Sequence, residues 1–183
     1  MLFRSPTLGL PCVLKQPDSS FSHGVVKVHT EEELNQRVEE LLEKSDLLVA
    51  QEFLPTEFDW RIGVFNGQPL WACRYHMAAK HWQIVKHRRD GSYSYGKVDT
   101  CPVAEVPKTI VRAAVRASRL MGNGLYGVDL KVIGRKGVVI EVNDNPNIDA
   151  GYEDQVLKDE LYLRIMQGFL ERVRARTEGR TRA

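Results

Sequence analysis

The sequence lacks the features that mark membrane and secreted proteins. Its 183 residues contain no apolar run close to the roughly 20 residues that a membrane-spanning helix needs. The opening residues, MLFRSPTLGLP, lack the apolar core of a signal peptide, and the chain has no internal repeats or low-complexity segments. We therefore expect a globular, cytoplasmic chain without a membrane partner.

Cysteine is scarce. Cys12, Cys73 and Cys101 are odd in number, far apart and without CxxC spacing, so neither a disulfide framework nor a zinc site is indicated. We expect them to be small buried residues. The sequence also has no P-loop pattern and no Ser-His-Asp or Cys-His pattern, so nothing indicates a protein nucleophile.

Apart from its C-terminal end, the chain also lacks a net positive charge. Its net charge is +2, but five arginines and one glutamate after residue 171 contribute +4, so the preceding residues carry −2. Residues 176–183 are expected to form a solvated basic tail at the end of a helix. A contact between this tail and nucleic acid stays open, but the tail has no aromatic side chain to stack on a base, and we do not expect nucleic acid as the main partner.

Residues 126–147, YGVDLKVIGRKGVVIEVNDNPN, form the clearest pattern in the chain. Two segments of alternating apolar and polar residues flank a short glycine-containing turn, which predicts a β-hairpin. Alternation places Glu141 and Asn143 on one face. If the turn holds an odd number of residues, Asp129 lies directly opposite Glu141. The residues expected on the other face are Val138, Ile140 and Val142.

Asp129, Glu141 and Asn143 together suggest a site for a hard cation. Two neighbouring carboxylates repel each other unless something positive lies between them. Mg²⁺ takes oxygen ligands, usually one or two carboxylates together with phosphate oxygens and water. The alternative is a hairpin with one solvated face that carries three polar side chains.

The rest of the chain reads as alternating strands and helices. The predicted strands are 11–15, 24–28 and 47–54, and a second hairpin lies around Asn66-Gly67. The predicted helices start at a Thr30 and Glu33 capping box, at Pro107, and near Gln155.

Two polar regions remain open to more than one interpretation. Counting outward from Asn66-Gly67 brings Asp59 opposite Arg74, as an ion pair or as two walls of a charged site. Lys15 precedes the loop QPDSSFSH, where it could bind a phosphate or simply end a strand. Residues 80–97 mix basic and aromatic side chains; this stretch could bind nucleic acid, close over a polyphosphate, or form a solvated loop.

In order and spacing, Lys15, AQEFLPTEFDWRIGVFNG, GVDL and VVIEVNDNPN resemble an ATP-grasp enzyme, most closely the RimK-type and glutathione-synthetase-like carboxylate-amine ligases. The resemblance implies an α+β fold, with a largely antiparallel sheet, helices packed on one side, and two lobes around a nucleotide cleft. Residues 1–54 would be part of the small lobe, ending in a linker strand that contacts adenine. Residues 55–175 would be the C-terminal lobe with the metal site, and 176–183 the tail.

The resemblance also implies where ATP and metal bind. Asp59 would hold the ribose hydroxyls, with Glu57 as the alternative, and Lys15 would contact a phosphate. Arg61 and Arg74 would contact the γ-phosphate or an acyl-phosphate. The residues implied at the adenine edge are Gln51, Glu52, Phe53 and Leu54. The residues implied around two Mg²⁺ ions, or Mn²⁺ in their place, are Asp129, Glu141 and Asn143.

Such ligases join a carboxylate to an amine, and the amine could be an amino acid, a peptide or a protein terminus. Related ligases are commonly oligomers, so the resemblance leaves a homo-oligomer open. The sequence departs from the family in the few glycines of its phosphate loop, in Asn147 where glycine is common, and in the missing upstream half with its substrate domain. We therefore expect either a domain of a longer ligase or, as the alternative, a truncated nucleotide-binding module without catalysis.

Overall fold

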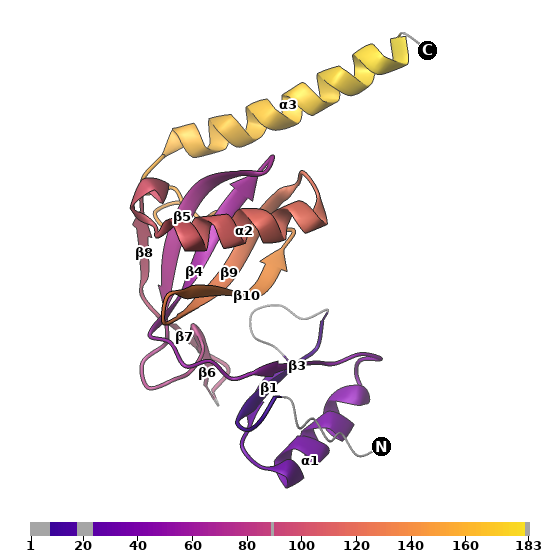
Figure 1. Ribbon diagram of the computed structural model, residues 1–183, viewed down its shortest axis with the longest axis vertical. Coiled ribbons are helices and arrows are strands. Elements are labelled where there is room, and N and C mark those ends of the chain that lie inside the picture. Colours follow the sequence, from indigo (N-terminus) through magenta and orange to yellow (C-terminus); the bar gives the residue numbers. More distant parts are fainter. Residues whose placement is uncertain (1–7, 18–23, 89, 182–183) are drawn as a thin grey trace. The chain divides into compact units, whose positions relative to one another are not determined.

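A computed structural model describes residues 8–17, 24–88 and 90–181 (Figure 1). The chain divides into two compact units. The first comprises Met1–Pro55 with Val85–Ser94, and the second comprises Thr56–Ile84 with Tyr95–Ala183. Each unit has its own sheet and its own apolar core.

The first unit is a three-stranded antiparallel sheet with one helix. Its strands β1, β2 and β3 span Cys12–Lys15, Val25–Val28 and Val49–Glu52, and their order is β2-β1-β3. Helix α1, Glu31–Leu42, begins where the capping box predicts, because Thr30 Oγ1 accepts a hydrogen bond from Glu33 N at 3.2 Å. The core of this unit contains Cys12, Leu14, Val28, Leu34 and Leu41.

Part of the basic stretch at 80–97 forms a small hairpin of its own. Strands β6, Val85–His87, and β7, Tyr93–Tyr95, pair with each other, and the sequence did not predict them. Asp90 shapes the turn, because its Oδ1 accepts hydrogen bonds from Ser92 N at 2.9 Å and from Ser92 Oγ at 2.6 Å.

The second unit is built on a five-stranded antiparallel sheet. Its strands are β4 Phe58–Phe65, β5 Gln68–His76, β8 Val98–Cys101, β9 Leu125–Ile133 and β10 Lys136–Asn143. Their order is β10-β9-β4-β5-β8, so both predicted hairpins lie in one sheet and β4 and β9 join them. The α+β class and the largely antiparallel sheet expected from the sequence are confirmed.

Helix α2, Lys108–Met121, covers one face of this sheet (Figure 1). A short 3-10 turn, η1 at Val103–Glu105, leads into it, and Gly122, with φ of 127°, ends it. Because side chains alternate along each strand, every second residue faces the helix. The buried residues of this layer include Trp60, Ile62, Val64, Ile110, Ala114, Val128 and Leu130.

Helix α3, Asp159–Thr181, starts later than predicted, because residues 150–158 form successive turns. Its residues Leu161 and Ile165 pack with Trp71 and Cys73, which lie on the sheet face opposite to α2. The expectation that the helices pack on one side is therefore wrong for α3. Along the described parts of the chain, no helix is both long enough and apolar enough to cross a bilayer.

Candidate functional site

The hairpin of β9 and β10 brings Asp129 and Glu141 together as predicted, but for a different reason. The turn contains two residues, since Ile133 pairs with Lys136, and an even turn alone would separate the two carboxylates. A β-bulge at Ile140 adds one residue to β10 and shifts the register, so that Glu141 pairs with Asp129. The two-residue turn places Val138 opposite Lys131, and the bulge beyond it brings Glu141 onto the same face, which corrects the predicted position of Val138.

Arg61 lies on the other side of Asp129. The two residues are register partners on β4 and β9, and Arg61 Nε and Nη2 donate to Asp129 Oδ1 and Oδ2 at 2.7 and 2.8 Å. Their side chains are only 14% and 15% exposed. Burial would lower the pKa of Arg61, but the charge and hydrogen bonds of Asp129 outweigh burial and raise this pKa above its ordinary value. The result is a row of alternating charge across three strands.

Gly127 explains how the loop after β10 can approach this row. A Cβ at Gly127 would lie 2.8 Å from Pro146 Cβ, which is closer than packed carbon atoms come. Glycine therefore allows Pro146 to pack directly on β9, and Asn143, the register partner of Gly127, points its Nδ2 at the Gly127 carbonyl at 3.4 Å. The GVD and EVNDNP motifs are thus one packed unit.

The oxygen donors on this face fit a hard cation whose remaining ligands would come from a substrate. Among the described residues no group of three or more His, Cys, Asp or Glu could hold a metal, so the protein itself offers two carboxylates and one amide. A carboxylate has about four lone-pair sites, so Asp129 can bind Arg61 and still contribute an oxygen to a cation. Mg²⁺ commonly binds through one or two carboxylates and substrate phosphates, which agrees with Asp129, Glu141 and Asn143.

The predicted pairing of Asp59 with Arg74 is wrong. A bulge at Leu70, next to Pro69, shifts the register between β4 and β5, so that Asp59 pairs with Tyr75 and Arg74 pairs with Trp60. Arg74 therefore lies on the α2 face, while Arg61 lies on the face of Asp129. The two arginines that the resemblance implies as phosphate contacts therefore lie on opposite sides of the sheet.

Asp59 has two partners that the sequence did not indicate. Lys131 Nζ donates to Asp59 Oδ1 at 2.5 Å, and Thr56 Oγ1 donates to the same oxygen at 3.0 Å. Burial raises the pKa of the Asp59 carboxyl above its ordinary value, and the charge of Lys131 only partly opposes this effect. Strand alternation could have found Lys131, because it lies two residues after Asp129 and so on the same face.

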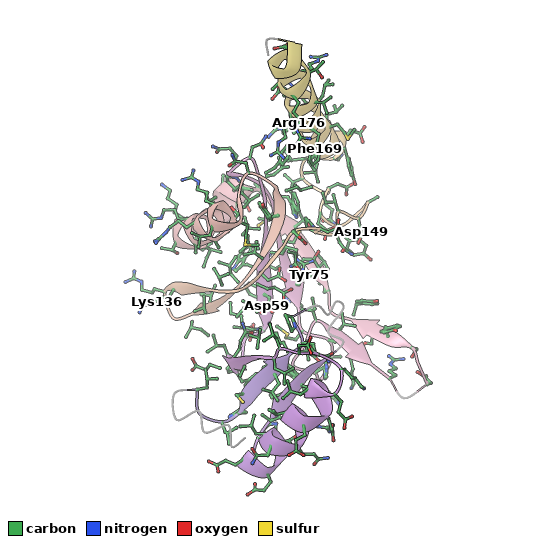
Figure 2. The ribbon with its side chains drawn as sticks, turned by 90° about the vertical axis from the view of Figure 1, so that its right-hand side faces the viewer. Asp59, Tyr75, Lys136, Asp149, Phe169 and Arg176 are labelled. Atoms are coloured by element: carbon green, nitrogen blue, oxygen red, sulfur yellow. The ribbon has the colours of Figure 1, made fainter. Side chains whose placement is uncertain are left out.

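A second missed contact fastens the segment before α3 to the sheet. Glu153 is 2% exposed, and its carboxylate accepts hydrogen bonds from the Tyr75 hydroxyl and from Asp149 N, the latter at 2.8 Å. Burial, and then the bond to Glu153, raise the pKa of Tyr75. The Tyr75 ring also lies 4.8 Å from the Arg61 guanidinium. Figure 2 labels Tyr75, Asp59 and Asp149 in this region, and no sequence pattern links residues so far apart.

On the α2 face, Asp99 lies among three basic side chains. It accepts hydrogen bonds from Lys97 Nζ at 2.5 Å and His76 Nε2 at 2.7 Å, and Arg74 Nη2 lies 4.0 Å away. Lys97 first, and then His76, lower the pKa of Asp99. Arg74 thus has its own anionic neighbour, away from Asp129.

The residues expected at a nucleotide base and phosphate belong to the first unit. Lys15 ends β1 and pairs with Val49 at the start of β3, whereas Glu52 pairs with Cys12 at the opposite end. Gln51 and Glu52 lie on β3, an edge strand of its sheet, and Phe53 and Leu54 follow directly. Residues 18–23 of the predicted phosphate loop lie outside the described residues.

Comparison with known proteins gives one consistent result. The sequence model of the RimK-like ATP-grasp domain matches residues 3–161. A probable alpha-L-glutamate ligase of Aliivibrio fischeri is 31% identical over 176 residues, which cover 95% of this chain and 54% of that protein. A formate-dependent phosphoribosylglycinamide formyltransferase of Sulfurisphaera tokodaii is 28% identical over 79% of this chain and 37% of that protein.

The fold agrees with these sequence relationships. A crystal structure of D-alanine–D-alanine ligase from Bacillus anthracis is similar with a TM-score of 0.70 at 20% identity, covering 93% of this chain and 57% of that one. The chain thus spans between about a third and somewhat more than half of the length of these proteins. The match of the family model over most of the chain establishes that it belongs to the RimK-like ATP-grasp family.

Proposed function

We propose that this chain is the nucleotide-binding and metal-binding part of an ATP-dependent ligase that joins a carboxylate to an amine. The observation that carries the proposal is the charge row Arg61, Asp129 and Glu141, which the β4, β9 and β10 register places side by side. Two anionic reactants repel each other, so such a reaction needs fixed positive charge and a cation site in one place.

The residues have distinct roles in this proposal. Mg²⁺ held by Asp129, Glu141 and Asn143 would neutralise phosphate charge. Arg61, fixed by Asp129, would stabilise the transferring phosphoryl group. We assign this role to Arg61 because Arg74 lies on the other face of the sheet.

The remaining proposed residues would bind ATP. Lys15 would bind a phosphate, and Asp59, oriented by Lys131, would accept hydrogen bonds from the ribose hydroxyls. The adenine edge would meet backbone groups of Gln51, Glu52, Phe53 and Leu54.

The proposed reaction has two steps and needs no nucleophile from the protein. A carboxylate oxygen of the substrate attacks the γ-phosphorus of ATP, and ADP leaves, which gives an acyl-phosphate. The amine nitrogen then attacks the acyl carbon, inorganic phosphate leaves, and the nitrogen loses a proton to give the amide. The protein contributes positioning and charge, as in other phosphoryl transfers.

A thermal unfolding experiment with Mg-ATP tests the site. A ligand at 100 times its dissociation constant stabilises the folded state by about 2.7 kcal/mol. We expect a Mg²⁺-dependent rise in the midpoint for the wild type, and a loss of this rise in Asp129→Asn and Glu141→Gln. Each variant is compared with its own midpoint without nucleotide, because Asp129→Asn also removes a partner of Arg61.

Asp46→Asn is the matched control. Asp46 is exposed in the loop before β3, and its substitution should leave the rise unchanged. A rise that persists in both site variants would disprove the assignment of Asp129 and Glu141.

A nucleotide-binding module without ligase activity is the second candidate. It is favoured by the predicted phosphate loop PDSSFSHG, which contains a single glycine. The two candidates differ in turnover: a ligase releases ADP when carboxylate and amine substrates are added, whereas a binding module shows the Mg-ATP stabilisation and no ADP release.

A further inference from the structure

Helix α3 has two apolar faces, and only one of them is buried. Leu161 and Ile165 are 0% and 7% exposed in the core beneath the sheet. Gly168 continues this inner face, since a Cβ there would lie 2.3 Å from the Phe65 ring. Arg172 completes it by donating to the Asn66 side chain and the Asn123 carbonyl. These four residues therefore define the face of α3 that packs on the second unit.

The outer face carries a separate apolar stripe. Leu163, Met166, Leu170 and Val173 are 62%, 65%, 47% and 60% exposed. Their spacing of three, four and three residues is the a and d pattern of a coiled coil. By helical geometry, 100° per residue, this stripe points away from the inner face. A contiguous exposed stripe of this kind marks a contact surface rather than scattered surface residues.

The charges beside the stripe favour one kind of partner. α3 is acidic at its start, with Asp159 and Glu160, and basic toward its end, with Arg174 and Arg176. An antiparallel copy of the same helix places Leu163 opposite Val173 and Met166 opposite Leu170, around a two-fold axis near Gly168. The flanking positions then bring Glu160 opposite Arg174, twice by symmetry. A parallel pair would instead bring the two basic ends together.

We propose that α3 is a homodimer surface, on which the outer stripe pairs in antiparallel fashion with α3 of a second copy. The sheet of each second unit packs on the inner face of its own helix, so the two sheets do not compete for the space between the helices. Glu160 already accepts a hydrogen bond from Arg164 at 2.9 Å, but both side chains are about half exposed, and a carboxylate has room for a further partner. In Figure 2, the labels Phe169 and Arg176 mark the middle and the basic part of this helix.

The expected dimer is weak and concentration-dependent. The stripe spans about 15 Å of helix, and small interfaces belong to the transient class. This inference does not depend on the ligase proposal, because it concerns residues that take no part in the charge row.

Sedimentation velocity of the full chain, from about 1 to about 200 µM, tests the proposal, since this range covers weak association. We expect a monomer–dimer equilibrium in the wild type. Met166→Glu should raise the dissociation constant by about tenfold or more, because it buries a charge in the stripe. The matched control is Leu120→Glu on α2, which is 89% exposed and outside the stripe, and it should have no effect.

A charge exchange tests the orientation. Glu160→Arg and Arg174→Glu should each weaken the dimer, and the double variant should restore it, because the two charges would simply have changed places. Helicity by circular dichroism checks that α3 remains folded. A wild type that stays monomeric over the whole range, a dimer that resists Met166→Glu, or a double variant no better than the singles would overturn the proposal.

Discussion

The two faces of the five-stranded sheet come from the same strands but differ in chemistry: one is apolar and buried, and the other carries the charged side chains of the candidate site. Toward α2 the strands present buried apolar side chains such as Ile62, Val128 and Leu130, all 0% exposed. Toward the other side, the neighbouring positions on the same strands present Arg61, Asp129 and Lys131. Because side chains alternate along a strand, one short segment, GVDLK, provides residues for the apolar core and residues for the candidate site. Stability and the candidate site should therefore respond to different substitutions.

The largest expected effect is on the apolar face. Leu130→Ala should lower the free energy of unfolding of the second unit by about 2–5 kcal/mol, because it leaves a cavity beneath α2. Urea unfolding measures the change. Ile133→Ala, on the same strand but 39% exposed, is the control and should cost far less. Equal losses at the two positions would contradict the division between the faces.

A smaller effect is expected from the Arg61 and Asp129 pair. Arg61→Met or Asp129→Leu alone should each cost about 1–3 kcal/mol, because each leaves a charged, mostly buried partner without its hydrogen bonds. The double variant should lose less than the sum of the two, since neither member of the pair is left without its partner. Urea unfolding of all four proteins gives the coupling, and simple additivity would show that the pair does not act as a unit.

The Tyr75 and Glu153 contact should link the segment before α3 to the polar face. Tyr75→Phe removes the hydroxyl that Glu153 accepts, at a cost of about 1 kcal/mol or more, because Glu153 is buried. Hydrogen exchange of the Asp149 amide should become faster, since its acceptor is Glu153.

Tyr162→Phe is the control for this contact. Tyr162 is 37% exposed, and its hydroxyl bonds Asp154 at 3.1 Å. Little change in unfolding is expected from this variant. Unchanged exchange at Asp149 in Tyr75→Phe would refute a fastening role for the contact.

The smallest expected effect is a difference between Asp59 and Asp99, which lie on opposite faces of the sheet. Their contributions to stability should change with pH in opposite directions. The raised pKa of Asp59, caused by burial, means that its contribution to stability is present below its ordinary pKa of 3.8 and is lost as the pH rises through the folded value. The lowered pKa of Asp99, caused by Lys97 and then His76, gives the reverse: stability is present above 3.8 and is lost as the pH falls through the folded value.

Urea unfolding over a pH series measures both slopes. The free energy of unfolding of the wild type, minus that of Asp59→Asn, should fall as the pH rises from 3.8. The corresponding difference for Asp99→Asn should rise between the folded pKa and 3.8. Two slopes of the same sign would contradict the environments described for these two carboxyls.

The sequence by itself determined the motifs and most of the secondary elements, although not β6 and β7. Thr30 and Glu33 set the start of α1, Asn66-Gly67 set a hairpin, and alternation placed Asp129 and Glu141 on strands that pair. These signals are local, because capping, turn chemistry and alternation depend on residues a few positions apart. The same motifs were sufficient for the resemblance to the ATP-grasp enzymes, which the family match confirms.

Only the tertiary structure decided which side chains meet across strands. The bulges at Ile140 and Leu70 each shift a register by one residue; the first keeps Asp129 beside Glu141 despite an even turn, and the second separates Asp59 from Arg74. The contact of Tyr75 with Glu153, and the burial of one apolar face of α3 rather than the other, depend on packing between distant segments. A bulge changes every cross-strand neighbour beyond it, yet it depends on the fit of the whole sheet rather than on any short pattern.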